Sequence, residues 1–166
     1  MEVKIKDAIL AQAAGEGMDA FLTAILSAIK GQVGDELNAA GMQQLSPDQI
    51  TLWGYMLLRD ELMDGGFVQL IYNGYGPFFF DNPFAKAMRL WGLHDFSKLL
   101  YKAKKEYDAH KADLTRERTD DEFMALFEQY PVFDDLDDEF VEGEEDITAA
   151  VAHYVDEHLS AFVVVE

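Results

Sequence analysis

The chain has 166 residues, 49% of them hydrophobic, so it is long and apolar enough to bury the core of one domain, residues 1–166. Its 13 Lys and Arg stand against 32 Asp and Glu, and the net charge of −19 argues against direct binding to nucleic acid or to an anionic membrane. Disulfides and thiolate sites are excluded because cysteine is absent, and the lack of a signal peptide or an apolar span predicts a cytoplasmic protein.

The first third of the chain is predicted to be mainly helical. Residues 3–6 alternate apolar and charged side chains, which is typical of a short strand. Apolar residues recur every three or four positions over 18–29, a spacing that predicts an amphipathic helix. Ser46 is a good N-cap, and the helix that follows it is predicted to cover 47–63 and to end at Gly65-Gly66.

The middle of the chain alternates apolar segments with turn residues. The short apolar run 67–72 fits either a helix or a strand, and residues 73–77 predict a turn. Residues 81–83 suggest a cap followed by a proline, before a helical face over 84–91 that ends at Gly92.

Three helical patterns fill the rest of the chain. Residues 95–117 have one apolar and one charged face, and 119–122 resemble a capping box before a helix that Pro131 ends. Gly143 is expected to interrupt the next pattern before a last helix over 147–159. The apolar end, 162–165, is either a short strand, which could pair with residues 3–6, or a tail packed on the core. We therefore predict an all-α, multi-helix domain with short strands only at its termini.

No motif identifies a reaction. His153 and Glu157 are four residues apart and could share a metal, but a hydrogen-bonded surface pair explains them more simply. The acidic stretch 134–146 lacks the spacing of a calcium loop. Phosphate-binding and nucleophile motifs are also absent, so we expect no enzyme, no cofactor and no metal site. The aromatic run 75–80 is better explained as core than as a docking patch.

Charge is distributed very unevenly. Residues 119–166 contain no Lys or Arg but 16 of the 32 acids. Solubility alone would explain a high total charge, but ordinary surfaces mix the two signs. The concentration therefore suggests a surface that binds a cationic protein. The candidate partner-binding residues are Asp134, Asp135, Asp137, Asp138, Glu139, Glu142, Glu144, Glu145 and Asp146.

Three segments resemble the C-terminal domain of the DNA mimic protein 19 family: the run 59–76, with its Gly-Gly-Phe element and downstream Gln and Asn, the helix 85–93 and the late 133–137. The resemblance covers about 45–162, and 1–44 would be variable N-terminal helices. It implies an all-helical fold, no cofactor, no catalytic residue, and an acidic decoy for a basic DNA-binding protein, with a homodimer as one assembly. Two other interpretations are an immunity or regulatory protein that neutralises a basic toxin or enzyme, and a helical domain whose acidity serves only solubility.

Overall fold

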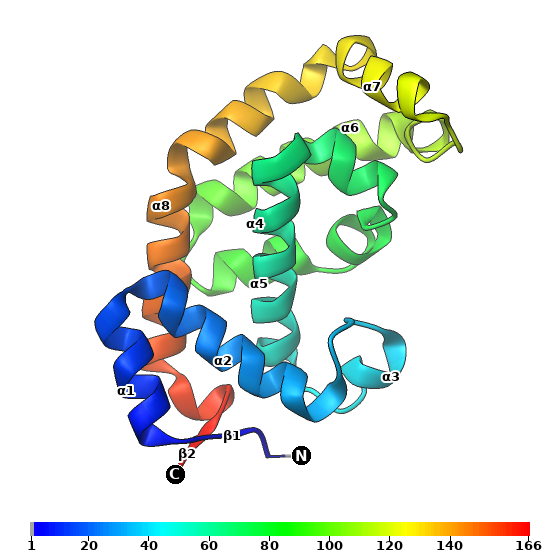
Figure 1. Cartoon of the computed structure of the whole chain (residues 1–166). Coiled ribbons are helices and arrows are strands. Elements are labelled where there is room, and N and C mark those ends of the chain that lie inside the picture. Colours follow the sequence, from blue (N-terminus) through cyan, green and yellow to red (C-terminus); the bar gives the residue numbers. More distant parts are fainter. Residues whose placement is uncertain (1) are drawn as a thin grey trace. The chain divides into compact units, whose positions relative to one another are not determined.

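The computed structural model describes residues 2–166, and Met1, the first residue of the predicted segment 1–44, lies outside them. The described chain is mainly helical, with short strands only near its termini (Figure 1), so the all-α prediction is confirmed. In order, the elements are β1 (Lys4–Ile5), α1 (Asp7–Glu16), α2 (Met18–Val33), α3 (Ala39–Met42), α4 (Pro47–Tyr72), the π-helical turn η1 (Pro77–Asp81), α5 (Phe84–Leu90), α6 (His94–Leu114), α7 (Asp120–Gln129), the 3-10 turn η2 (Pro131–Phe133), α8 (Asp134–Glu157), the 3-10 turn η3 (Leu159–Ala161) and β2 (Val164–Val165).

The chain divides into two compact units. We call them the terminal unit, which comprises the residues up to Tyr55 together with Asp146–Glu166, and the central unit, Met56–Glu145. Helices α4 and α8 contribute residues to both units. The assignment of residues 1–166 to a single domain stays a prediction.

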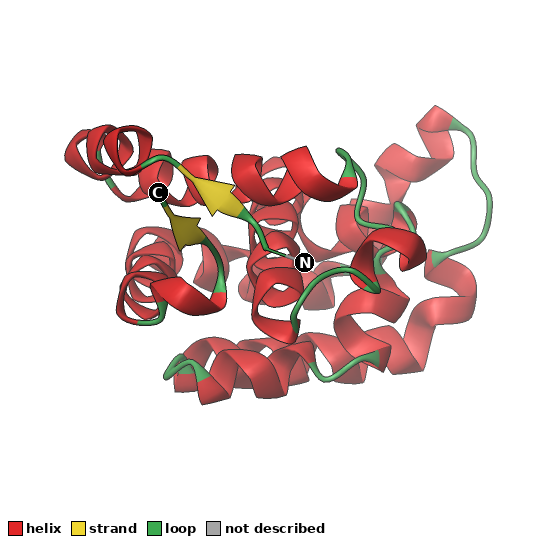
Figure 2. Ribbon diagram, turned by 90° about the horizontal axis from the view of Figure 1, so that it is seen from below, coloured by secondary structure: helices red, strands yellow, loops and turns green. Residues whose placement is uncertain are grey.

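The two ends of the chain pair within the terminal unit. Strands β1 and β2 run parallel beside each other (Figure 2), with Lys4 opposite Val164 and Ile5 opposite Val165. Of the two alternatives that the sequence left open for residues 162–165, the chain therefore forms the strand that pairs with residues 3–6. The Val164 N–H donates to the Val3 carbonyl at 2.7 Å. Because Val3 and Ile5 are buried beside Phe162 and Val163, the strands close one end of the apolar core of this unit.

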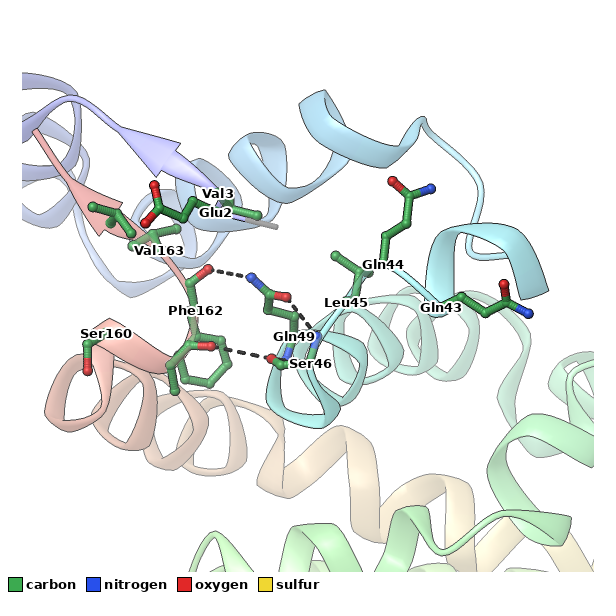
Figure 3. Close-up of a pocket in the computed structure, with 12 residues that line it drawn as sticks. Glu2, Val3, Gln43, Gln44, Leu45, Ser46, Gln49, Ser160, Phe162 and Val163 are labelled. Carbon is green, nitrogen blue, oxygen red and sulfur yellow. Dashed lines mark hydrogen bonds between the residues drawn. The ribbon is translucent and has the colours of Figure 1, made fainter.

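A capping box starts α4. The Gln49 N–H donates to the Ser46 hydroxyl at 3.2 Å, and the Ser46 N–H donates to Oε1 of Gln49 at 2.9 Å. The same Gln49 amide donates to the Phe162 carbonyl at 2.8 Å, which ties the helix start to the chain end (Figure 3). The bond to Phe162 is a structural role of Gln49 that the sequence pattern around Ser46 did not reveal. Ser46, Gln49 and Phe162 line a pocket of about 380 Å³, and the hydrogen bonds just described, which belong to the fold, join these three residues to one another.

The aromatic run 75–80 contributes two of its four rings to the core of the central unit, whereas Tyr75 and Phe78 are partly exposed. Phe79 and Phe80 in η1 are buried, and the ring of Phe80 lies 4.9 Å from that of Tyr107 between centroids. Gly76 is needed beside them, because a β-carbon there would collide with the Tyr107 ring. The preference for a core is therefore confirmed for Phe79 and Phe80.

Of three predicted helix caps and breaks, one is confirmed and two are wrong. The Thr119 hydroxyl accepts the Glu122 N–H at 3.3 Å, so the cap predicted for α7 is confirmed. The cap predicted at 81–83 is wrong, because no side chain caps α5 and the Asn82 amide donates to the Pro77 carbonyl instead. The predicted interruption at Gly143 is also wrong: α8 continues through it as one helix. A mid-helix glycine costs only about 1 kcal/mol, which buried residues on the same helix, such as Phe140 and Val151, outweigh.

Candidate protein-binding surface on helix α8

Helix α8 presents a buried side and an exposed side. Phe140, Val151 and Val155 are fully buried and form the apolar stripe that fixes its orientation. The nine acids predicted as partner-binding residues all lie on this helix, but they divide between its two sides. Asp137 and Glu144 are only partly exposed, whereas the other seven are exposed: Asp134, Asp135, Asp138, Glu139, Glu142, Glu145 and Asp146.

The exposed acids share one face. Because an α-helix turns by about 100° per residue, the seven exposed acids fall within an arc of about 140°. The same turn of about 100° per residue places Asp137 and Glu144 on the side of the helix that carries the buried Phe140. We use the term acidic face for the six exposed acids that belong to the central unit, from Asp134 to Glu145. Asp146 follows on the same helix and belongs to the terminal unit.

The acidic face is not neutralised by Lys or Arg of the described residues. Within residues 2–166, no ion pair joins a Lys or Arg to any of its six carboxylates. The cation that does pair with α8 is Arg59, which lies 3.6 Å from Oε1 of Glu144 on the inner side of the helix. Asp134 and Asp135 also lie in the first helical turn, where the helix dipole favours negative charge. The exposed charge is therefore free to attract cations from outside.

Asp137 has a structural task. Its Oδ1 accepts the Phe67 N–H at 2.8 Å, directly after Gly66, whose φ of 71° and ψ of −167° break the helical path of α4. The carboxylate thus caps the second helical segment of α4, and residues 67–72 are helical. Burial, opposed by the Phe67 bond and aided by the nearby Asp134 and Asp138 charges, raises the pKa of Asp137 to about 6.

The break in α4 is held by amide side chains as well. The Gln69 amide donates to Glu61 at 2.9 Å and to Asp64 at 3.0 Å, and the Asn73 amide donates to the same Glu61 oxygen at 3.0 Å. The Phe67 ring is buried, with the Phe133 ring 6.3 Å away between centroids. The Gly-Gly-Phe element, its downstream Gln and Asn, and the late 133–137 segment therefore meet at one structural feature.

Asp137→Asn should raise stability at neutral pH. The folded-state pKa of about 6 lies above the unfolded value of about 3.9, so the contribution of this group to folding is largest below about pH 4 and is lost as the pH rises through 6. Raising the pKa of a carboxyl group from about 3.9 to about 6 corresponds to about 3 kcal/mol, which partial exposure reduces to about 1–2 kcal/mol. Asparagine keeps an oxygen for the Phe67 N–H and does not ionise.

Urea unfolding at about pH 4 and about pH 8 measures this effect. We expect Asp137→Asn to be more stable than the parent by about 1–2 kcal/mol at the higher pH and by less at the lower one. The exposed Glu142→Gln is the matched control, because its charge is not among the causes of the raised Asp137 pKa, and it should leave the difference in stability between the two pH values nearly unchanged. Lower stability of Asp137→Asn at the higher pH would show that the charged cap, and not its burial, dominates.

The acidic side chains of the described residues are not arranged as a metal centre. Among residues 2–166, no group of three or more His, Asp or Glu side chains is placed to hold a metal ion. His153 and Glu157 form an exposed pair, 3.0 Å between Nε2 and Oε1. No helix in the described part of the chain combines the length and apolarity that crossing a membrane requires.

These features define an acidic all-α protein in which one helix, α8, presents its exposed carboxylates on one side. Comparison with known proteins agrees: the model of the DMP19-like protein family matches residues 43–158, close to the predicted 45–162, and the chain belongs to this family. It is 34% identical over 132 residues to the DNA mimic protein DMP19 of Neisseria meningitidis serogroup B. That alignment covers 79% of this chain and 78% of the relative.

Proposed function

We propose that this protein is a DNA mimic, whose acidic face occupies the DNA-binding surface of a basic cytoplasmic protein. The observation that carries the proposal is the one-sided exposure of the six carboxylates, which no Lys or Arg of the described chain neutralises. The kinship with a protein named a DNA mimic supports it. Solubility alone would not require the acids to share one face.

The spacing of the charges resembles that of a DNA strand. From Asp134 to Glu145, α8 rises by about 16 Å, and its six exposed acids give one charge per about 3 Å of axis. A single strand of a duplex carries one phosphate per about 3.4 Å. A groove lined with Lys and Arg that fits one phosphate backbone would therefore meet carboxylates at a similar interval, although carboxylates offer fewer acceptor oxygens than phosphates.

The binding energy would be mainly electrostatic. The acidic face repels itself in the free protein, and a cationic partner relieves that repulsion while it gains charge-assisted hydrogen bonds. Exposed pairs are screened by salt, so the affinity should fall steeply as the salt concentration rises. The fast, long-range attraction between the two surfaces also favours rapid association.

A pull-down followed by a competition assay tests the proposal. The tagged chain is incubated at low salt with an extract of its own cells, and bound proteins are released by increasing salt and identified. We expect DNA-binding proteins in the salt-released fraction, and we expect the chain to displace each such protein from its DNA in a band-shift assay. A salt-released partner that binds no DNA would favour the immunity interpretation. Recovery of only neutral or acidic proteins would contradict mimicry.

A further inference from the structure

A small apolar groove lies within the terminal unit, beside the late part of α8. Its volume is about 320 Å³, and its floor and walls come from the α1–α2 junction and from α8. We call it the anchor groove; it is lined by Ala14, Met18, Phe21, Ala149, Ala152, His153 and Asp156. The two α8 alanines leave room there for a side chain that none of the residues 2–166 supplies.

Negative charge brackets the anchor groove. On α8, Asp146 precedes Ala149 by three residues and Asp156 follows Ala152 by four, and all four positions fall on the same side of the helix by the turn of about 100° per residue. Both acids are exposed. The lining contains no Lys or Arg. Of the three lysines of this unit, Lys4 pairs with Glu166 at 3.4 Å, Lys30 lies over the Trp53 ring, and Lys6, at the start of α1, is not part of the groove lining.

We infer that the anchor groove receives one large apolar side chain from the cationic partner, with flanking Lys or Arg residues on Asp146 and Asp156. The inference rests on the proposed function and adds the feature by which the protein would select one cationic partner over another. Exposed ion pairs contribute little each, whereas a buried apolar anchor at the centre of an interface commonly dominates affinity. The acid flanks select a basic segment, and a second copy of this chain, with a net charge of −19, would be repelled.

Two synthetic peptides test the anchor. Both are fluorescent helices of alternating Lys and Ala with equal length and charge, and they differ only at one central residue, Leu in the first and Gln in the second. Binding to the full-length protein is measured by fluorescence anisotropy over a range of salt concentrations. We expect the Leu peptide to bind at least about tenfold more tightly, because burying one Leu contributes that much.

A variant that fills the groove assigns the effect to this place. Ala149 is exposed, so Ala149→Gln adds bulk without changing charge, and it should remove the preference for the Leu peptide while leaving the Gln peptide unaffected. Ala112→Gln, at an exposed position of α6, is the matched control and should retain the preference.

The outcomes separate this inference from the proposed function. Equal, salt-sensitive binding of both peptides would overturn the anchor and leave the electrostatic surface intact. Absence of salt-sensitive binding by either peptide would contradict both. If sedimentation shows that Ala149→Gln converts a dimer of the free protein to a monomer, the occupant is a second copy and the inference is wrong.

Discussion

Gly66→Ala is expected to destabilise the central unit by about 3–5 kcal/mol. At φ 71° and ψ −167°, Gly66 occupies a backbone region that side-chain-bearing residues avoid at a cost of about 1–3 kcal/mol. A β-carbon there would also collide with the Asp137 carboxylate. Displacing that carboxylate would leave the Phe67 N–H without its acceptor, which costs a further 1–3 kcal/mol or so.

Urea unfolding followed by far-UV circular dichroism measures this loss. Gly31→Ala in α2 is the matched control, because a β-carbon at Gly31 meets open space and Ala is the better helix former by up to about 1 kcal/mol. Asp137→Ala should make room for the new methyl group, so Gly66→Ala should cost less in that background. Equal effects of Gly66→Ala and Gly31→Ala would show that the break in α4 is not a required feature.

The helices were predictable because their signals are local. The apolar spacing over 18–29 and the Thr119 cap each lie within a few residues of the structure they specify. The conformation of residues 67–72 was not predictable in this way, since a short apolar run suits both a helix and a strand. The capping bond that supports the helix comes from Asp137, 70 positions later. The Gly143 prediction failed because packing along α8 outweighed the weak helix propensity of one glycine.

The acid-rich composition of residues 134–146 predicted the candidate surface, and the position of each acid around helix α8 shows which of them belong to it. The acid run identified nine residues, but composition could not separate exposed carboxylates from Asp137 and Glu144, which have the same chemistry. The sequence did contain a spacing that distinguishes these two acids from the others. Asp137 and Glu144 are seven residues apart and flank the buried Phe140 at three and four positions, which places all three on one side of a helix. The sequence suggested a helix break at Gly143, so the three residues were not recognised as parts of one continuous helix.

Neutralising four residues of the acidic face should weaken binding strongly without harming the fold. The informative variant changes Asp138 to Asn and Glu139, Glu142 and Glu145 to Gln, because these exposed residues have no ion-pair partner within residues 2–166. Asp137 is kept as the cap of Phe67, and Asp134 is kept because it complements the helix dipole. If each exposed pair contributes up to about 1 kcal/mol, affinity for the salt-released partner should fall on the order of a hundredfold at low salt.

A matched variant separates position from total charge. Neutralising four exposed acids outside α8, namely Glu2, Asp35, Glu36 and Glu117, changes the net charge equally and should leave most of the affinity. The dependence of affinity on salt should become shallower in the α8 variant, because fewer ion pairs form, and nearly parallel to the parent in the control. Relief of like-charge repulsion should raise the thermal stability of the α8 variant slightly. If both variants lost affinity equally, the partner would be responding to net charge, and the one-sided arrangement on α8 would have no part in recognition.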